Sequence, residues 1–170
     1  KALYVGISKY PPAQAKIAYE MLRAAGVPCL ISQYRYSMFD RTVEEKSLPL
    51  AAEQGSGFIA FSPLAQGLLT KKYLHGIPEH SRAARSTGFL KVDQVTEDKV
   101  GKARRLDEIA ARRGQTLAEM ALAWVLKDER MTSVIVGTSS VKQLADNLHA
   151  LDNLNFTNEE LAEIEGILRL

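Results

Sequence analysis

Four short apolar runs alternate with helix-forming segments along the chain. The runs lie at residues 2–7, 27–32, 57–61 and 133–136, and they do not alternate apolar with polar positions. Strands of this kind are buried on both faces, so they predict an α/β fold with a parallel sheet covered by helices. Two architectures stay open on this pattern, a doubly wound open sheet and part of a barrel.

Turn-forming residues set the limits of the first two helices. Pro11 and Pro12 favour a helix start, and Gly26 favours its end. A second helix over residues 43–54 should end at Gly55. The predicted buried face of the first helix comprises Ile17, Met21, Leu22 and Ala25.

Capping residues predict four further helices. Thr96 begins the first of them, and Gly114 ends it. The other three begin with a Thr or Ser followed three residues later by Glu or Gln, which is a capping box. The boxes pair Thr116 with Glu119, Ser140 with Gln143, and Thr157 with Glu160. The predicted apolar faces are Val100, Ala103, Leu106, Ile109 and Ala110; Leu117, Met120, Ala121, Trp124 and Val125; Val141, Leu144 and Leu148; and Leu161, Ile164 and Leu168.

Two transitions from strand to loop indicate a binding site. After the strand at 57–61 the chain passes through Ser62 and Pro63 to a small-residue turn around Gly67. After the strand at 133–136, residues 137–140 open a helix with small residues and hydroxyls. Backbone N–H groups at the start of a helix attract anions. We therefore expect a site for an anionic cofactor.

Residues 63–95 show no periodicity and are too many for an ordinary connection, which indicates a working loop. Within it, residues 67–91 carry five basic residues and one acid, an excess of four against +2 for the whole chain. The phosphates of a nucleotide are natural ligands for such a segment. A solvated basic loop without a ligand is the alternative. The charged residues are Lys71, Lys72, Arg82, Arg85 and Lys91, with Glu79 as the acid.

Composition excludes several classes of protein. The 170 residues are 46% hydrophobic, enough for a core, and a net charge of +2 does not indicate nucleic acid or an anionic membrane as partner. Cys29 is the single cysteine, and no apolar run approaches the roughly 20 residues of a membrane-spanning helix. We expect a cytoplasmic protein. Because the chain starts at Lys1, within two residues of an apolar run, we also expect that the beginning of a longer protein is missing.

Several motifs, in order along the chain, carry a resemblance to a known family. They are YVGIS at 4–8, QYRYS at 33–37, AFSPLAQGLLTKKY at 60–73, GIPEHSR at 76–82 and VGTSSVKQLADN at 136–147. With them the chain resembles the C-terminal half of the aldo-keto reductases, (β/α)8 TIM barrels that reduce carbonyls with a nicotinamide cofactor. The nearest branch holds the bacterial L-glyceraldehyde 3-phosphate reductases and the voltage-gated potassium channel β-subunits. The resemblance implies a half-barrel of strands five to eight over residues 1–170, without the N-terminal half.

The resemblance also implies what this half does. The catalytic Asp, Tyr, Lys and His of the family lie on earlier strands, so no catalytic residue is expected, and His75, His80 and His149 receive no role. No metal site is expected. In the complete barrel NADP(H) would serve the reduction of a small aldehyde or ketone, and the chain alone would be inactive. The alternative is a non-catalytic NADP-binding regulatory or interaction module similar to the channel β-subunits.

A half-barrel of this kind has unpaired outer strands and an apolar inner face. Such surfaces are normally covered in a folded protein. We therefore expect two half-barrels to associate, or the chain to pair with an N-terminal half.

By resemblance, three residues hold the nicotinamide. Ser8 and Gln33 match positions that bond the carboxamide, which needs both a donor and an acceptor. Lys9 stands where many relatives have Asn. Phe61 matches an aromatic ring that covers one nicotinamide face. Without the resemblance, Ser8 would be interpreted as a helix cap and Phe61 as part of the core.

The loop after the third strand contributes Ser62, Pro63, Leu64 and Gly67 to the implied cofactor site. Lys72 and Arg82 match basic positions that contact the cofactor, and the loop that carries them folds over it in the resembling branch. Lys71 stands where relatives often have Gly and is not assigned.

The last loop and helix complete the implied site. Gly137, Ser139 and Gln143 match contacts to phosphate and ribose, at the place where barrels commonly bind phosphate. Asp146 and Asn147 match an acid–Asn pair that bonds the adenine, with Asp where relatives usually have Glu. The alternative for Gln143 is that it only caps its own helix.

Overall fold

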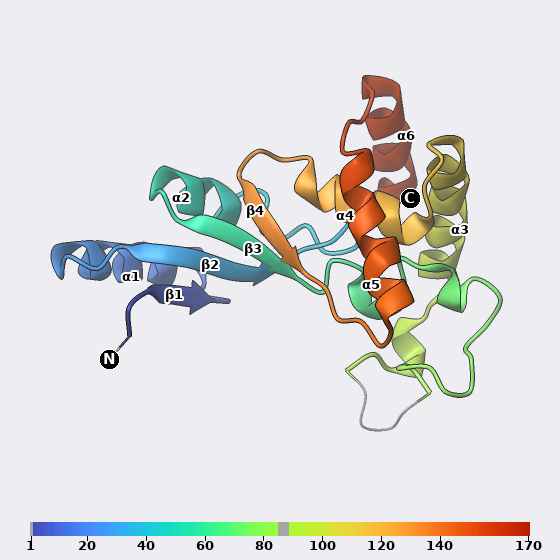
Figure 1. Ribbon diagram of the computed structural model, residues 1–170, viewed down its shortest axis with the longest axis horizontal. Helices are drawn as coiled ribbons and strands as arrows, with labels where there is room; N and C mark the ends of the chain where they lie inside the picture. The colour runs from blue at the N-terminus through green and yellow to red at the C-terminus, as the bar shows by residue number, and fades with distance from the viewer. Residues whose placement is uncertain (1, 85–88) are drawn as a thin grey trace.

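The computed structural model describes residues 2–84 and 89–170. In chain order its elements are β1 (Val5–Ser8), α1 (Pro12–Ala24), β2 (Cys29–Arg35), α2 (Ser47–Glu53), β3 (Gly57–Phe61), the 3₁₀ turns η1 (Ala65–Gly67), η2 (Lys71–Tyr73) and η3 (Val92–Gln94), α3 (Glu97–Arg112), α4 (Leu117–Leu126), β4 (Met131–Ile135), α5 (Val141–Leu148), η4 (His149–Asp152) and α6 (Asn158–Arg169). The sheet with α1 and α2 forms one end of the molecule, and α3 to α6 form the other (Figure 1). No helix in the described ranges is long and apolar enough to cross a bilayer.

The sheet has the order β1-β2-β3-β4, and every neighbouring pair of strands is parallel. Connections between parallel strands are right-handed, so crossovers that all step in one direction place their helices on one face of the sheet. A doubly wound sheet reverses direction to cover both faces, and the described strands show no reversal. The predicted parallel α/β fold with outer helices is confirmed, and it is compatible with part of a (β/α)8 barrel.

Several element boundaries differ from the prediction. β1 starts at Val5 rather than at residue 2, and β4 is Met131–Ile135 rather than 133–136. β2 is Cys29–Arg35 rather than 27–32, because the Val27 N–H donates to the end of α1 and Pro28 has no N–H. α2 is shorter than residues 43–54, since 42–46 form turns.

The helices α3, α4 and α6 form largely as predicted. All members of the first two predicted faces are buried, including Leu106 and Trp124. Of the face predicted for α6, Ile164 is buried and its two companions are half-buried, and Ile167, which was not predicted, is buried as well. Thr96 caps α3, and complete capping boxes begin α4 and α6. A side-chain cap contributes about 1 kcal/mol. Between residues 63 and 95 the described residues, 63–84 and 89–95, form no helix longer than a 3₁₀ turn and no strand, as expected for an irregular loop.

The buried face of α1 is not the predicted one. Ala15 and Tyr19 are buried instead, and the Tyr19 hydroxyl lies 2.6 Å from Ser32 Oγ on β2. Residues two positions apart on a helix point in nearly opposite directions, so this rotation turns Ile17 and Met21 away from the sheet. Of the predicted face, Ile17 (56%), Met21 (68%) and Ala25 are exposed, and Leu22 is half-buried.

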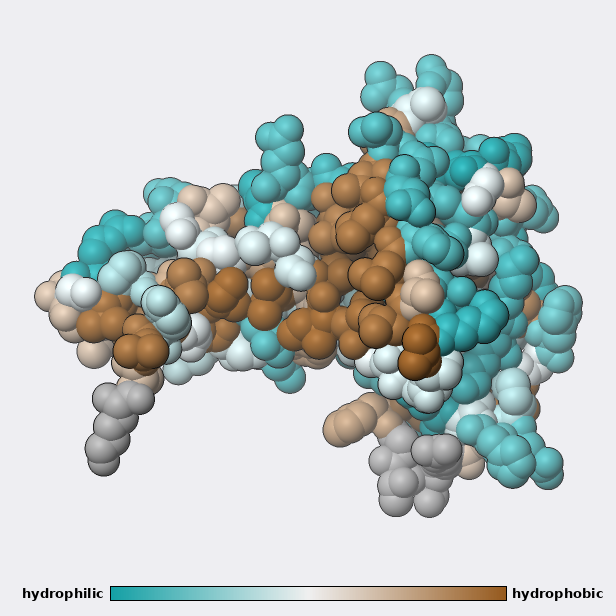
Figure 2. Space-filling model, in the orientation of Figure 1, coloured by the Kyte–Doolittle hydropathy of each residue, from teal (hydrophilic) through white to brown (hydrophobic). Residues whose placement is uncertain are grey.

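The predicted apolar face of α5 is uncovered. Val141 is 86% exposed, and Leu144 and Leu148 are exposed as well. Ile135 at the end of β4 and Leu151 after α5 extend this surface. Figure 2 shows hydrophobic side chains running from the sheet across to this helix. These five exposed residues are called the apolar band below.

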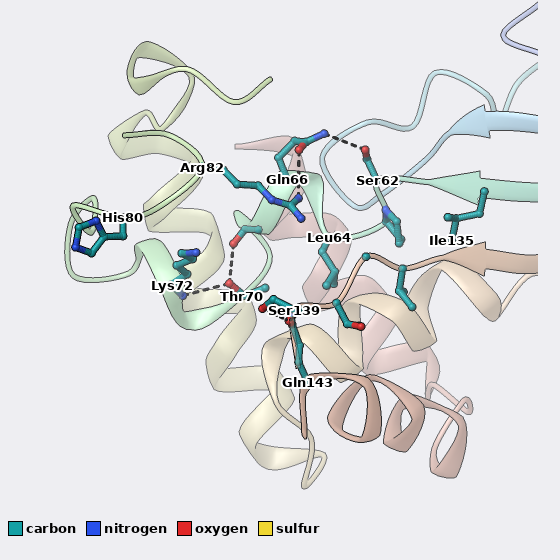
Figure 3. A pocket seen from close by; sticks show the side chains of 15 residues that line it. Ser62, Leu64, Gln66, Thr70, Lys72, His80, Arg82, Ile135, Ser139 and Gln143 are labelled. Atoms are coloured by element: carbon teal, nitrogen blue, oxygen red, sulfur yellow. Dashed lines mark hydrogen bonds between the residues drawn. The ribbon is translucent and has the colours of Figure 1, made fainter. Parts of the chain in front are cut away.

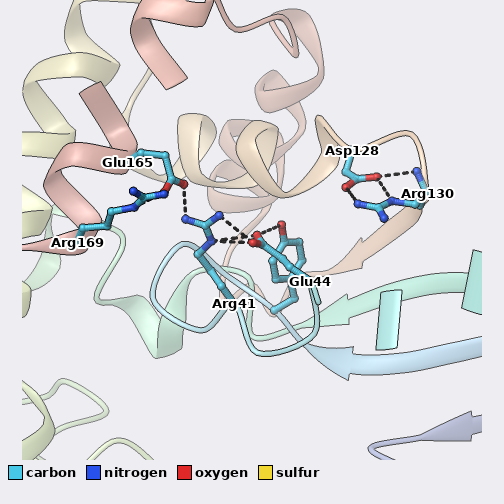
Figure 4. A network of polar contacts seen from close by, with 7 residues as sticks. Arg41, Glu44, Asp128, Arg130, Glu165 and Arg169 are labelled. Carbon is cyan, nitrogen blue, oxygen red and sulfur yellow. Dashed lines mark hydrogen bonds and ion pairs between the residues drawn. The ribbon is translucent and has the colours of Figure 1, made fainter. Parts of the chain in front are cut away.

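A cluster of charged side chains ties the segment after β2 to α6 (Figure 4). Arg41 donates to both carboxylate oxygens of Glu44, with 2.7 Å between Nη2 and Oε2, and it also donates to Glu165 on α6. The Tyr36 hydroxyl donates to Glu44 over 2.8 Å. Burial alone would raise the pKa of Glu44, but the hydrogen bonds from Arg41 and Tyr36 outweigh it and hold this pKa below its usual value.

The uncovered edges predict self-association of the chain. β1 and β4 each have one neighbouring strand in the described sheet, and the apolar band adjoins β4. Leu148→Glu should weaken association about tenfold or more, since an unpaired carboxylate is costly to bury. Leu170→Glu, which changes an exposed leucine at the end of the chain, should have little effect. Sedimentation equilibrium measures both. A well-folded monomer at high concentration that binds little hydrophobic dye would contradict the prediction.

Glu44→Gln should lower the free energy of unfolding by about 1.5 to 3 kcal/mol at neutral pH, because charge-assisted hydrogen bonds are weakened. Folding lowers the pKa of Glu44, so its stabilisation is fully present above the unfolded-state value of about 4.3 and is lost as the pH falls through the folded-state value. Urea unfolding at neutral pH and at about pH 3 should therefore show a difference that shrinks in acid.

Glu163→Gln is the matched control, because its pair with Arg112 is exposed. Its effect should stay below about 1 kcal/mol at both pH values. If the Glu44→Gln difference is the same in acid and at neutral pH, the ionised carboxylate is not the source of the stability.

Candidate functional site

A groove of 510 Å³ lies between the loop after β3 and the loop after β4 (Figure 3). The segment that carries Lys72 and Arg82 contributes to its lining. Of the residues that the sequence predicts for the cofactor, the groove brings together Ser62, Pro63, Leu64, Gly67, Lys72, Arg82, Gly137, Ser139 and Gln143.

The loop after β3 is held in a strained backbone conformation. Ser62, Ala65 and Gln66 have φ angles of 54°, 47° and 62°, in the left-handed region that residues with a Cβ seldom adopt. Each such residue costs about 1 to 2 kcal/mol. Tight turns hold the conformation, with the Ala65 N–H donating to Ser62 O and the Gly67 N–H to Leu64 O. Strain of this kind concentrates at ligand sites, where the surrounding structure enforces it.

A buried tyrosine anchors the segment that carries Lys72 and Arg82. Tyr73 is buried, and its hydroxyl accepts a hydrogen bond of 3.4 Å from the Ala83 N–H, next to Arg82. The Thr70 hydroxyl accepts from the Lys72 N–H over 3.2 Å. The Arg82 Nη1 donates to Gln66 Oε1 over 3.4 Å. Both basic side chains are thus held on segments that border the groove.

The other wall is the start of α5. Ser140 caps the helix, its hydroxyl accepting from the Gln143 N–H over 3.2 Å. Gln143 Oε1 accepts from the Ser139 N–H (2.9 Å) and from the Ser139 hydroxyl (3.1 Å). The predicted capping box is therefore displaced by one residue, because the glutamine bonds to Ser139 rather than back to Ser140. This arrangement stiffens the turn and leaves the positive end of the helix dipole at the groove.

The charged groups that line the groove are of one sign, positive. Its lining within the described residues includes Lys72 and Arg82 and no Asp or Glu. Lys71, which the sequence left unassigned, is not among the lining residues and pairs with Asp107 on α3, 3.4 Å between Nζ and Oδ2. Arg85 lies outside the described residues, and Lys91 is not among the lining residues. Such a groove suits an anion with several phosphate oxygens.

Of the three residues predicted for the nicotinamide, Ser8 and Phe61 end their strands, and Gln33 lies two residues before the end of β2. Ser8 and Gln33 are partners in the β1–β2 register. No side chain caps α1, so the helix-cap alternative for Ser8 does not hold. Phe61 is half-buried and lines a second cavity, of 470 Å³, together with Lys9. Ser62 and Gln66 border both cavities.

Asp146 and Asn147, predicted for the adenine, do not line the groove. Asp146 forms an ion pair with Lys142 one turn earlier, 2.8 Å between Oδ2 and Nζ. Asn147 is only 9% exposed, and its Nδ2 has no hydrogen-bond partner among the described residues. An unsatisfied buried amide costs about 1 to 3 kcal/mol, so this donor is available to a ligand that reaches it.

The tyrosines near this end of the sheet are engaged elsewhere. The Tyr34 hydroxyl donates to Tyr10 O over 2.8 Å, and burial raises the pKa of Tyr34 to about 12. The Tyr36 hydroxyl donates to Glu44 on the helix-covered side, and burial likewise raises its pKa. Neither hydroxyl is directed at the groove.

Sequence reasoning did not single out several residues that line the groove. Gln66 is the most informative, because it contacts both Ser62 and Arg82. It stands inside the motif at 60–73, where a polar residue between apolar neighbours in a Gly-containing turn was an available signal. The other lining residues without a predicted contact are Thr70, His80, Ile135 and Val136, whereas Thr138 belongs to the predicted segment 137–140.

Comparison with known proteins gives a consistent result. The sequence model described as "Aldo/keto reductase family" matches residues 1–169. The chain is 48% identical over 169 residues to an L-glyceraldehyde 3-phosphate reductase of Escherichia coli O157:H7, covering 97% of this chain and 49% of that protein. It is 46% identical to the L-glyceraldehyde 3-phosphate reductase of Escherichia coli strain K12, with the same coverage. The chain thus spans about half the length of these curated relatives, and it belongs to the aldo/keto reductase family.

Proposed function

We propose that the chain is the NADP(H)-binding, C-terminal half of an aldo-keto reductase barrel, corresponding to strands five to eight. The observation that carries this proposal is the groove, which joins Lys72, Arg82 and the start of α5 without an acid among its described lining residues. Such a lining attracts a nucleotide phosphate far more than a neutral sugar or an apolar ligand.

The described residues fit this cofactor in three respects. Lys72 and Arg82 supply charge for the 2′-phosphate and pyrophosphate, and the Gly137–Ser139 turn supplies backbone at the helix start. The unpartnered Asn147 Nδ2 is a donor for a ring nitrogen of adenine. Asp146 would have to leave Lys142 to join it.

At the other end of the site, Ser8 and Gln33 are proposed to bond the carboxamide, and Phe61 to cover one face of the nicotinamide. All three are at least partly accessible, at or near the carboxyl ends of their strands. The bound cofactor would supply a hydride. The role of this half is to orient the cofactor and to exclude water from one side of it.

In the complete barrel we propose that a small aldehyde or ketone is reduced. The name of the two relatives makes glyceraldehyde 3-phosphate the first substrate to test. The chain alone is proposed to be inactive, since the described residues that line the groove and the second cavity include no tyrosine to protonate the developing alkoxide. A non-catalytic cofactor-binding module is the competing proposal, and the complementation experiment below separates the two.

The cofactor prediction concerns Arg82. Arg82→Ala should weaken NADPH binding about tenfold or more and leave NADH nearly unchanged, because a charge-assisted hydrogen bond contributes about 1.5 to 3 kcal/mol and NADH lacks the 2′-phosphate. Lys71→Ala is the control, since Lys71 points to Asp107. Cofactor fluorescence titration measures each affinity. Equal losses for both cofactors would mean that Arg82 contacts another part of the molecule.

The activity prediction uses complementation. The purified 170-residue chain should not reduce glyceraldehyde or its phosphate. Co-expression with the first four βα units of a relative should restore NADPH-dependent reduction, because those units bring the general acid, which typically contributes about 10²- to 10⁴-fold. Turnover by the chain alone would refute the proposal. A complex that forms and binds NADPH but stays inactive would favour the non-catalytic module.

A further inference from the structure

We propose that Gln66 is a positioning residue that holds the Arg82 guanidinium across the groove, so that the phosphate-binding arginine is ordered before a ligand arrives. The proposal rests on the proposed function only in taking the ligand to be the cofactor's phosphate. Its structural content concerns two side chains and is testable in the free protein.

The Gln66 amide uses both of its ends. Nε2 donates to Ser62 Oγ over 3.1 Å, and Oε1 accepts from Arg82 Nη1 over 3.4 Å (Figure 3). The reversed amide would set its NH₂ group against the guanidinium, two donors facing each other. Arg82 therefore fixes the orientation of the amide, and Ser62 fixes its place.

The strained turn after β3 sets the direction of the Gln66 side chain. Gln66 has a φ of 62° and follows Ala65 at 47°, so the chain reverses where its side chain leaves the loop. Conformations of this kind cost free energy and persist where the surrounding structure enforces them. Here the turn directs a glutamine side chain out of the β3 loop toward an arginine sixteen residues later.

Arg82 reaches the opposite wall of the groove. Its Nη2 lies 3.8 Å from the point where a Cβ on Gly137 would stand. Tyr73 anchors its backbone through the Ala83 N–H, and Gln66 anchors its side chain. The guanidinium thus bridges the β3 and β4 loops, at the level where the groove must receive an anion.

The neutrality of the anchor is what makes it suitable. A glutamate at position 66 would order Arg82 equally well but would cancel much of its charge. Glutamine supplies an acceptor and leaves the positive charge for a phosphate, and Arg82 forms no ion pair with any described residue. Ordering a long side chain in advance saves entropy that binding would otherwise lose, a gain of about twofold to tenfold in affinity.

A double-mutant cycle tests the coupling. NADPH affinity is measured for the unmodified chain, Gln66→Gly, Arg82→Ala and the double variant. Glycine accepts a φ of 62° without strain, so the substitution removes the anchor while the turn is kept. We expect Gln66→Gly to weaken NADPH about twofold to tenfold, and to have no effect once Arg82 is alanine. An equal loss in both backgrounds would assign Gln66 a merely structural role and overturn the proposal.

Two further variants, Gln66→Glu and the remote control Gln14→Ala, test the argument from charge. Gln66→Glu should weaken NADPH more than NADH, because it keeps the acceptor and adds a negative charge beside the phosphate. Gln14→Ala, on the exposed surface of α1, should change neither affinity. A Gln66→Glu variant that binds NADPH as well as the unmodified chain does would contradict the argument from charge.

The free protein gives an answer that does not depend on the cofactor. The order of the Arg82 side chain is measured from its Nε–Hε signal by nuclear magnetic resonance relaxation. Gln66→Gly should release the side chain, whereas Gln66→Glu and Gln14→Ala should keep it ordered. If the chain binds no NADPH, the proposed function fails and this measurement still decides the inference. An Arg82 that is equally mobile with and without Gln66 would overturn it.

Discussion

Every strand of the sheet runs in the same direction, and the location of the site depends on this constraint. Parallel strands bring their carboxyl ends to one edge, so Ser8, Gln33 and Phe61 lie at or near that edge although they come from different parts of the chain. The loops after β3 and β4 leave from the same edge, and the groove forms between them. Local sequence provides polar residues at strand ends, and strand direction makes them neighbours.

Several basic residues form ion pairs with carboxylates, and these cations do not line the groove. Arg35 pairs with Asp40, Lys71 with Asp107 and Lys142 with Asp146. None of these three cations is among the described residues that line the groove. Lys72 and Arg82 form no ion pair with a described residue, so their charge stays directed at the groove. Lys71 and Lys72 are adjacent in a 3₁₀ turn, but Lys71 pairs with Asp107 whereas Lys72 lines the groove, so the count of basic residues in the loop overstates the charge that a ligand meets.

The sequence predicts best where the signal is local. The caps at Thr96, Thr116 and Thr157 depend on residues three positions apart. The apolar faces predicted for α3 and α4 are buried, because these two helices pack against each other and against neighbouring elements. The prediction fails where burial depends on partners that periodicity does not reveal. On α1 the buried face contains Tyr19, whose hydroxyl and the Ser32 hydroxyl share a hydrogen bond, and not the predicted apolar residues. On α5 no element among the described residues covers the apolar face. In the site, the motifs located most of the groove, whereas Gln66 was missed because its role requires knowing that Arg82 lies beside it.

The two ends of the proposed cofactor site depend differently on the uncovered edges. The phosphate end lies between the loops after β3 and β4, and its contacts Gln66–Arg82, Thr70–Lys72 and Ser139–Gln143 are all made within the chain. The nicotinamide end includes Ser8 on β1, an outer strand with one described neighbour, so one side of it is open. On the proposed function, the chain would hold the nucleotide phosphates in a groove that is already formed, while a dry pocket around the nicotinamide would require the open side of β1 to be covered. The proposal therefore separates phosphate affinity from carbonyl chemistry, and covering the open side of β1 should affect mainly the second.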